Sequence, residues 1–275
     1  MTSETYHNRF SGIGRLYGRS ATEVIHGMHV CVVGLGGVGS WAVEALARSG
    51  VGSLTLIDYD TIAESNINRQ IHAGTRSLET KKHQALAERV RDINPHCDCR
   101  IIDDFLTADN LFEYMSTDYD YVIDAIDSIK FKSAMIYHCK RNRIPIITTG
   151  GAGGLTDPTQ IAIRDLNKTH NDPLAAKVRA QLRSSYGFTR NMKRYFGIEC
   201  VYSTEQQRYP KADGSIGFAK PGIHGISMDC NFAYGSATMV TGTFGFVAAA
   251  RVIEKTLKKH LQAGAPAALA VDEKG

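Results

Sequence analysis

The sequence is poor in the residues that build disulfide frameworks and structural zinc sites. Its 275 residues include six cysteines without a repeated spacing, and the closest pair is Cys97-x-Cys99. This pair is too tight for a structural zinc site, which is built from Cys-x-x-Cys pairs. Scattered cysteines are typical of the reducing cytosol, and the first residues, MTSETYHNRFSGIGR, lack the apolar run of a secretory signal. We therefore expect a cytoplasmic protein.

The sequence also lacks a strong excess of positive or negative charge. The formal net charge is +4, and the chain is 43% hydrophobic and 22% charged, as in an ordinary globular protein. So small a positive excess indicates an acidic partner only weakly. The composition therefore excludes neither an enzyme nor a binding protein.

A long uncharged stretch occurs only near the C-terminal end. Residues 232–252, FAYGSATMVTGTFGFVAAARV, carry no charge before Arg251 and approach the length of a membrane span. Their glycine, serine and threonine residues favour close packing inside a protein, so we predict a buried core helix. The basic continuation RVIEKTLKKH keeps peripheral membrane association through residues 232–260 as an alternative.

Apolar runs alternate with helical patterns between residues 29 and 150. The runs are VCVVG, SLTLID, CRIID, YVIDAID and IPIITTG. Strands that are apolar on both faces and alternate with helices form a parallel sheet with right-handed crossovers. This pattern predicts an α/β fold, a Rossmann-like, doubly wound, mainly parallel sheet with helices on both faces.

The alternation changes after Gly150. GGAGGLTDPTQIAI predicts a glycine-rich turn and a strand, and IECVYST a further strand. DPLAAKVRAQLRSSYG predicts a helix with Asp172 as N-cap and Pro173 at its first position. We therefore predict an N-terminal helical arm (1–28), a central α/β domain (29–155), a mixed C-terminal extension of the same fold (156–262) and a disordered tail (263–275).

The first strand breaks into a glycine loop, VCVVGLGGVGS, before the helical pattern SWAVEALARSG. Its glycines are Gly34, Gly36, Gly37 and Gly39, and Asp58 follows 19 residues later at the end of the next strand. Such a loop lets the backbone and a helix N-terminus approach phosphates, while the aspartate accepts from ribose hydroxyls. The pattern alone leaves NAD, FAD and ATP open.

The following loop, DYDTIAESNINRQIHA, favours a triphosphate. It contains Asp58, Asp60, Asn66, Asn68, Arg69 and Gln70. A redox cofactor needs no arginine there, whereas the planar guanidinium of Arg69 fits phosphate oxygens. The pattern TKKHQALAERV then predicts a helix from near Thr80 with Lys81 and Lys82 in its first turn. Two lysines there oppose the helix dipole unless an anion lies nearby.

A carboxylate site for Mg²⁺ is suggested by VIDAIDS, where Asp124 and Asp127 end a strand. Mg²⁺ prefers one or two carboxylates together with phosphate oxygens. The alternative for both residues is a role as a turn or helix-cap residue.

These motifs together resemble the ubiquitin-activating-like (E1-like, ThiF-type) adenylyltransferases, the family of the molybdopterin- and thiamine-pathway activators. GLGGVGS, IDYD, SNINRQ, a helical lysine and DAID occur in the same order. The resemblance implies that domain 29–155 binds ATP, that Arg69 and Lys82 stabilise the α-phosphate and that Asp127 binds Mg²⁺. The residues that would hold ATP are Gly34, Gly36, Gly37, Gly39, Asp58, Asp60 and Asn66. It also implies a homodimer in which Arg9 or Arg15 reaches the neighbouring subunit's ATP.

Further stretches resemble the tRNA threonylcarbamoyladenosine dehydratase branch of this family. They are RFSGIGRLYG, TTGGAGG, DPTQI, DPLAAKVRAQL and GSATMVTGTFGF. The resemblance implies adenylation of the threonylcarbamoyl carboxylate beside the tRNA anticodon, then ring closure with loss of AMP and net loss of water. It also implies a monovalent cation, Na⁺ or K⁺, and a cysteine desulfurase or sulfur-acceptor partner. Cys200 and Cys230 could handle sulfur, although we expect both to be passive.

A basic stretch in region 156–262 suits a tRNA substrate. KVRAQLRSSYGFTRNMKRYF holds six basic residues and no acidic one. The tRNA-binding candidates are Arg179, Arg183, Arg190, Lys193 and Arg194, and Tyr186, Phe188, Tyr195 and Phe196 could stack on unpaired bases. The alternative is a solvated face with ordinary core aromatics.

Three other functions stay open at this point. An activator of a ubiquitin-like or sulfur-carrier protein would exchange pyrophosphate in response to that protein, and not in response to tRNA. An NAD-dependent oxidoreductase would hardly need Arg69. A non-enzymatic sulfur-relay protein would depend on Cys230 and not on Arg69.

Overall fold

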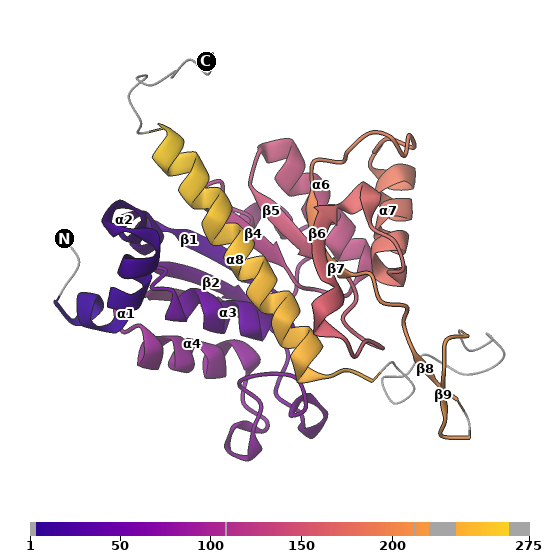
Figure 1. The fold of residues 1–275 in the computed structure, drawn as a ribbon, viewed down its shortest axis with the longest axis horizontal. Coiled ribbons are helices and arrows are strands. Elements are labelled where there is room, and N and C mark those ends of the chain that lie inside the picture. The colour runs from indigo at the N-terminus through magenta and orange to yellow at the C-terminus, as the bar shows by residue number, and fades with distance from the viewer. Residues whose placement is uncertain (1–3, 108, 212, 220–234, 264–275) are drawn as a thin grey trace, which may run out of the picture.

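A seven-stranded sheet forms the centre of the computed structural model, which describes residues 4–107, 109–211, 213–219 and 235–263. The strand order is β3-β2-β1-β4-β5-β7-β6 (Figure 1). All neighbouring strands are parallel except β6 and β7, which are antiparallel. The strands are β1 His29–Val33, β2 Ser53–Ile57, β3 Asp98–Ile102, β4 Tyr121–Asp124, β5 Ile146–Thr149, β6 Ile161–Asp165 and β7 Glu199–Ser203. The predicted mainly parallel sheet with a mixed extension is confirmed.

Helices cover both faces of this sheet. Those described are α1 Glu4–Tyr17, α2 Arg19–Gly27, α3 Gly39–Arg48, α4 Lys82–Ile93, α5 Leu111–Tyr114, α6 Ile129–Asn142, α7 Pro173–Ser185 and α8 Thr238–Ala263. Side chains of α2, α3, α4 and α8 share one core with one face of the sheet, and those of α5, α6 and α7 share a second core with the other. The fold is therefore doubly wound.

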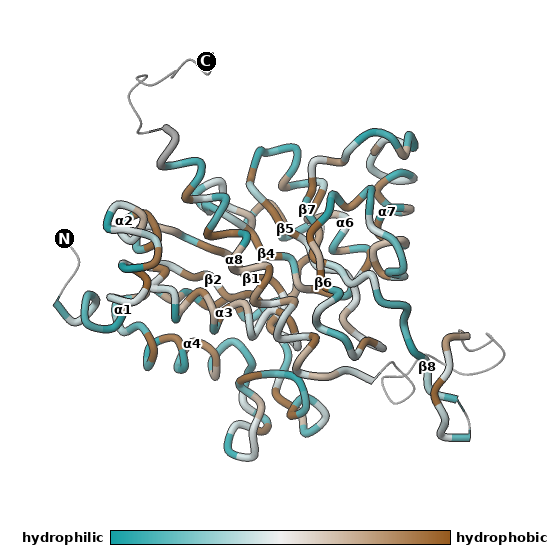
Figure 2. The backbone as a smooth tube through the Cα atoms, in the orientation of Figure 1, coloured by the Kyte–Doolittle hydropathy of each residue, from teal (hydrophilic) through white to brown (hydrophobic). Residues whose placement is uncertain are grey.

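The first strand shows why the central strands are apolar throughout. Val30 and Val32 point into the core beneath α3 and α8, whereas Cys31 and Val33 point into the core beneath α6. A strand buried on both faces needs apolar residues at every position, and the central strands are correspondingly hydrophobic in Figure 2.

Helix α8 contains most of the long uncharged stretch and packs against α3. At Gly245, a side chain's Cβ would lie 2.5 Å from the Val38 carbonyl oxygen and 2.8 Å from the Ala42 nitrogen. The small residue therefore permits a close helix crossing. One side of α8 is buried, as predicted, but Met239 and Phe246 are exposed, so the helix covers the sheet without being enclosed. No helix among the described residues is long and apolar enough to cross a membrane.

Helix starts follow the predicted signals with one shift. The Asp172 side chain accepts a 2.9 Å hydrogen bond from the Ala175 amide and caps α7. Helix α4 begins at Lys82 and not near Thr80, because the Lys81 backbone forms a β-bridge with Thr61.

A short hairpin projects from the body of the fold (Figure 1). Its strands are β8 Tyr209–Pro210 and β9 Ile216–Gly217. The 3₁₀ turns are η1 Glu64–Asn66, η2 Thr75–Ser77, η3 Pro158–Gln160 and η4 Leu166–Lys168. The tail predicted to be disordered lies, apart from Ala263, outside the described residues.

Candidate functional site: a phosphate loop with facing basic residues

The glycine loop joins β1 to α3, and two of its glycines are required by geometry. Gly34 has a φ of +83°, and its Cβ would lie 2.9 Å from the Ala125 carbonyl oxygen. At Gly39 a Cβ would lie 1.8 Å from the Gly34 oxygen. These close approaches fold the loop tightly over the end of β4, and only glycine fits at either position.

The other two loop glycines differ, because Gly36 leaves space whereas Gly37 lies tightly against Arg69. No neighbour lies closer than 3.9 Å to a Cβ placed at Gly36, and at Gly37 the Arg69 side-chain carbons lie 3.3 Å away. Helix α3 begins directly afterwards with Val38 as N-cap and no side-chain cap. A helix N-terminus of this kind, with glycines in front of it, is an anion-binding arrangement.

Asp58 ties the next loop to the glycine loop. Its Oδ2 accepts a 2.6 Å hydrogen bond from the Leu35 amide, and its Oδ1 accepts a 2.8 Å hydrogen bond from the Asp60 amide. Each carboxylate oxygen still has a lone pair for a further donor. Asp58 is nevertheless buried, so it organises the site as well as offering a hydroxyl acceptor.

Arg69 lies against the glycine loop because its own loop is fixed to α3 and to the start of α8. The Trp41 indole donates to the Arg69 carbonyl oxygen at 2.9 Å, and the Thr238 hydroxyl donates to the Asn68 carbonyl oxygen at 2.5 Å. Among the described residues, the Arg69 guanidinium itself donates only to neighbouring loop oxygens, of Ser65 at 2.5 Å and Asn68 at 3.0 Å. These local partners can be exchanged for phosphate oxygens.

Asn66 has a structural role in the loop that carries Arg69. Its side-chain oxygen accepts a 3.1 Å hydrogen bond from the Ala63 amide and closes the 3₁₀ turn before Arg69. The side chain is buried. Asn66 therefore shapes the loop that carries the arginine.

The two lysines at the start of α4 have different environments. Lys82 is 7% exposed in its side chain and pairs at 2.6 Å with Asp60, which is 45% exposed. Lys81 donates instead to the Tyr59 carbonyl oxygen and to Asp103 at the surface. Lys82 is thus a buried cation whose carboxylate partner faces solvent beside the glycine loop.

The two aspartates at and after the end of β4, Asp124 and Asp127, also have different environments. Asp124 is completely buried, accepts from the Thr148 hydroxyl at 2.6 Å and pairs with Lys132 at 3.0 Å. The magnesium interpretation of Asp124 is therefore wrong, because its carboxylate is enclosed and already neutralised. Asp127 is exposed and makes no hydrogen bond through its carboxylate within the described ranges. Its alternative as a cap fails, because Ser128 is the N-cap of α6.

Asp127 shares a space with the acidic residues after β2. Charge repulsion from Asp60, followed by burial and by the charges of Asp58 and Asp127, raises the pKa of Tyr59. No three His, Cys, Asp or Glu side chains in the described part of the chain gather to hold a metal ion by themselves. The residues present suit Mg²⁺, which takes one or two carboxylates and completes its shell with phosphate oxygens and water.

Three buried polar side chains around this site lack hydrogen-bond partners in the described structure. They are the Ser40 hydroxyl, the Gln70 side-chain oxygen and both ring nitrogens of His72. Burial, then the charges of Lys82 and Arg89, lower the pKa of His72 to about 4. The motifs did not indicate Ser40 or His72, because their burial, at the start of α3 and near Lys82, appears only in the folded structure.

The predicted tRNA-binding residues divide into two groups. Arg179 donates to the Thr169 hydroxyl, and Arg183 donates to Asn167 at 2.5 Å and lies 5.6 Å from the ring centre of the buried Phe196. The guanidinium groups of these two arginines thus bond within the protein, which neither the tRNA interpretation nor the solvated-face alternative predicted. Those that stay exposed are Arg190, Lys193 and Arg194, beside Tyr195.

The two N-terminal arginines also differ. Arg9 donates to the carbonyl oxygens of Asp92 and Ile93 at the end of α4, both at 3.1 Å. Arg15 is exposed and makes no hydrogen bond within the described ranges. Arg15 therefore has its whole guanidinium group available to another molecule, whereas Arg9 uses its Nη1 within the chain.

Of the two sulfur candidates, Cys200 lies among the described residues, and its thiol is not activated. Cys200 is fully buried, and burial raises its pKa well above the usual range. Cys230 lies outside the described residues.

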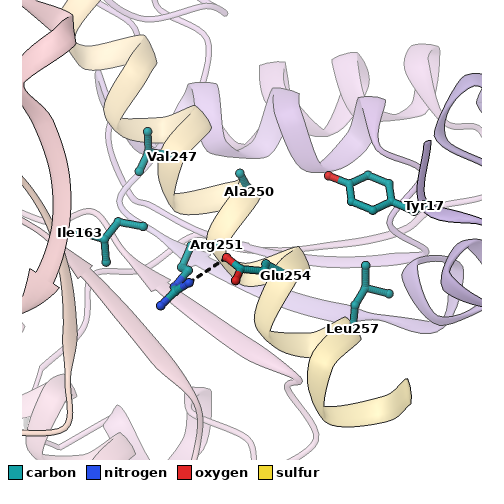
Figure 3. A pocket seen from close by; sticks show the side chains of 7 residues that line it. All are labelled: Tyr17, Ile163, Val247, Ala250, Arg251, Glu254 and Leu257. Carbon is teal, nitrogen blue, oxygen red and sulfur yellow. Dashed lines mark hydrogen bonds and ion pairs between the residues drawn. The ribbon is translucent and has the colours of Figure 1, made fainter. Parts of the chain in front are cut away.

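A separate apolar groove of about 510 Å³ lies between α8 and the end of α1 (Figure 3). It is lined by Tyr17, Ile163, Val247, Ala250, Arg251, Glu254 and Leu257. None of these residues belongs to the phosphate loop or to the loops that face it, so the groove is not the nucleotide site.

Comparison with known proteins identifies the family. The model of the ThiF family matches residues 10–273. The chain belongs to the ThiF family. It is 51% identical to a tRNA threonylcarbamoyladenosine dehydratase of Escherichia coli over 96% of this chain and 99% of that one, and 51% identical to its Haemophilus influenzae counterpart over 93% and 96%.

Solved structures agree with this family assignment. The E. coli tRNA N6-threonylcarbamoyladenosine dehydratase TcdA, solved in complex with ATP, has a TM-score of 0.86 to this chain at 48% identity. The match covers 96% of this chain and all (100%) of that one. The chain therefore shares its whole fold, including the C-terminal extension, with a ThiF-family structure that binds ATP.

Proposed function

We propose that this chain is an ATP-dependent tRNA threonylcarbamoyladenosine dehydratase. The observation that carries the proposal is the length of the match, since two dehydratases are 51% identical over 96% and 93% of the chain. A molybdopterin-synthase adenylyltransferase is 30% identical over 58% of the chain. The dehydratases therefore match a part of the chain that this adenylyltransferase does not match. We expect the tRNA-specific contacts in that part.

The geometry around the glycine loop suits binding of ATP by its phosphates. Gly36, Gly37 and the N-terminus of α3 offer backbone amides, and Asp58 offers its remaining lone pairs to ribose hydroxyls. Arg69 lies against Gly37, and Lys82 stands beside Asp60. These positions support the proposal that both cations neutralise charge that develops on the α-phosphate.

The chemistry proposed for this site has two steps. A carboxylate is a poor electrophile, so its oxygen first attacks the α-phosphorus of ATP and expels pyrophosphate. The carbamoyl oxygen then attacks the activated carboxyl carbon, a carbamoyl nitrogen loses a proton, and AMP leaves as the ring closes. The second step is intramolecular, so no cysteine nucleophile is needed. This agrees with the buried, weakly acidic thiol of Cys200.

Mg²⁺ would be held by Asp127 together with the phosphates and would add positive charge at the reacting phosphate. Asp127 suits this role because its carboxylate is exposed and free of hydrogen bonds in the described structure. A monovalent cation and a cysteine desulfurase or sulfur-acceptor partner remain predictions from the resemblance, as does the cytoplasmic location.

We further propose a homodimer in which Arg15 reaches the partner's ATP. Arg15 is exposed, and the neighbouring Leu16 and Tyr17 are 71% and 42% exposed. Apolar side chains this exposed at the end of a helix suit burial against another protein surface. The groove beneath Tyr17 in Figure 3 extends this apolar surface along α8.

The tRNA surface is proposed to centre on Arg190, Lys193 and Arg194, with Tyr195 exposed among them. Tyr195 is 71% exposed and carries Lys168 over its ring at 4.9 Å. Exposed cations bind phosphates, and an exposed aromatic ring stacks on unpaired bases. Arg179 and Arg183 keep a supporting role, because their guanidinium groups bond within the protein.

The deciding experiment incubates the protein with ATP, Mg²⁺ and tRNA that carries threonylcarbamoyladenosine. We expect a nucleoside lighter by one water, measured by mass spectrometry, with an equal amount of AMP. Arg69→Ala should abolish both products, whereas Arg76→Ala, which changes an exposed arginine in the same segment, should not. An intact nucleoside without AMP would reject the proposal, and pyrophosphate exchange stimulated by a carrier protein would then favour the alternative activator.

A further inference from the structure

Lys132 is a fully enclosed ammonium group in the first turn of α6. Its side chain is 2% exposed. Its Nζ donates to the Ile126 carbonyl oxygen at 2.9 Å and to the Asp124 carbonyl oxygen at 3.3 Å, and it pairs with the Asp124 carboxylate at 3.0 Å. Lysine is almost never fully buried without partners. Here the three partners equal the three protons of the ammonium group, and all belong to the turn after β4.

That turn, residues 124–127, lies between Lys132 and the glycine loop. On its far side, the Ala125 oxygen and an Ile126 methyl carbon lie 2.9 and 2.8 Å from where Gly34 would carry a Cβ. The Ala125 amide also donates to the Val33 oxygen at 2.9 Å. The turn therefore has the ammonium on one side, the phosphate loop on the other, and Asp127 at its exposed end.

We propose that Lys132 is a positioning residue for the divalent cation that accompanies ATP. By fixing the carbonyl groups of residues 124 and 126, it sets where the Asp127 carboxylate stands relative to the glycine loop. Lys132 itself is enclosed and touches neither nucleotide nor metal. The inference rests on the proposed function, because it concerns the ATP site of that reaction.

The pattern of bonds distinguishes this role from simple charge pairing. An ion pair needs only the Asp124 carboxylate, yet the ammonium also donates to the carbonyl oxygens of Asp124 and Ile126. Partners that orient a metal ligand typically change metal affinity 10- to 100-fold when they are removed. Lys140 offers a comparison on the same helix, because its Nζ donates to the Phe196 carbonyl oxygen, far along the helix from the turn.

The test separates binding of ATP from binding of the metal. Mn²⁺ replaces Mg²⁺ as the probe, and its affinity for the protein–ATP complex is measured by electron paramagnetic resonance. ATP affinity without divalent cation is measured by calorimetry. We expect Lys132→Met to weaken Mn²⁺ binding 10- to 100-fold and to alter its spectrum, with less than about a threefold change in metal-free ATP affinity. Lys140→Met should leave both affinities within about twofold of the unaltered protein.

A second variant allows for misfolding. If Lys132→Met does not fold, because Asp124 is left charged and unpaired, Asp124→Asn with Lys132→Met removes that charge and still lacks the ammonium. The same weakening of Mn²⁺ binding is expected in it. Mn²⁺ affinity within twofold of the unaltered protein in either folded variant would overturn the proposal, as would equal losses in Lys140→Met. Failure of the unaltered protein to bind ATP with Mn²⁺ would instead overturn the proposed function.

Discussion

Two buried lysines stand near the ends of the strands on either side of β1, and each is paired with an aspartate. Lys82 pairs with Asp60 after β2, and Lys132 pairs with Asp124 after β4. The ammonium groups are similarly enclosed, at 7% and 2% side-chain exposure, but the carboxylates are not, because Asp60 is 45% exposed and Asp124 is completely buried. The exposure of the partner decides what each lysine can do.

An exposed carboxylate can take up water when its lysine turns to a ligand, whereas an enclosed one cannot. Lys82 is therefore available to an incoming phosphate at small cost, and Lys132 is fixed. This difference supports the proposed roles, in which Lys82 stabilises charge in the transition state and Lys132 fixes the backbone of the turn after β4. Variants at the two positions should accordingly affect different properties.

The largest effect is expected in the stability of Lys132→Met. Removing one partner of a buried pair leaves an uncompensated charge and typically costs about 3–5 kcal/mol. We expect that loss in the free energy of unfolding, measured by urea denaturation. Adding Asp124→Asn should restore most of it, since no unpaired charge remains. Equal stabilities of the single and double variants would contradict the assignment of Asp124 as the charged partner.

The second-largest effect is expected in the catalytic rate of the Lys82→Met variant. Loss of one donor to developing charge typically lowers kcat about 10²–10³-fold, and we expect this in AMP formation under single-turnover conditions. The free energy of unfolding should change by less than about 1 kcal/mol, because Asp60 can be hydrated. A Lys82→Met variant that loses stability but keeps its rate of AMP formation would contradict the roles proposed for the two lysines.

The sequence predicted Lys82 and missed Lys132 for a physical reason. Two lysines at a helix start oppose the helix dipole, which is a local signal of a nearby anion. A lysine within SIKFK carries no such signal, because its burial depends on how α6 packs over the turn after β4. The same limit applies to Asp124 and Asp127, which look alike in VIDAIDS and differ only in the folded structure.

The fold was more accessible to prediction, because apolar runs and cap residues act locally. The runs in β1 and β2 and the Asp172 cap of α7 matched the structure. The internal bonds of Arg179 and Arg183 were not predictable in this way. Their partners Thr169 and Asn167 come from a different segment, next to β6.

A smaller effect, on the pH dependence of stability, is expected from His72, which lies near Lys82. Its folded-state pKa is lowered to about 4 from 6.5, so between these values the unfolded chain binds a proton that the folded chain does not. Stability therefore falls as pH drops through this window, by up to about 3 kcal/mol from this residue. We expect His72→Leu to flatten the dependence in urea titrations at pH 4.5 and 7. An unchanged slope would show that other groups cause the acid sensitivity.

Lys82→Met should also move the His72 pKa, because the Lys82 charge is the second cause of its depression after burial. We expect the pKa to rise without reaching its ordinary value, since burial remains. Titration of the imidazole by NMR would measure this. A fall in the pKa would contradict the placement of Lys82 next to His72.

The smallest effect is expected for Lys81→Met, which changes the neighbour of Lys82 in the sequence. Lys81 pairs with Asp103 at 2.9 Å, but both side chains are partly exposed, at 34% and 49%. Pairs of this kind contribute about 0–1 kcal/mol, so the equilibrium constant of unfolding should change by less than about fivefold. The single-turnover rate constant should change by less than about threefold, because Lys81 is held at the surface by Asp103. A rate loss as large as that of Lys82→Met would mean that Lys81 leaves Asp103 to reach the phosphates. The assignment of the reacting charge to Lys82 alone would then be wrong, since both ammonium groups at the start of α4 would serve the nucleotide.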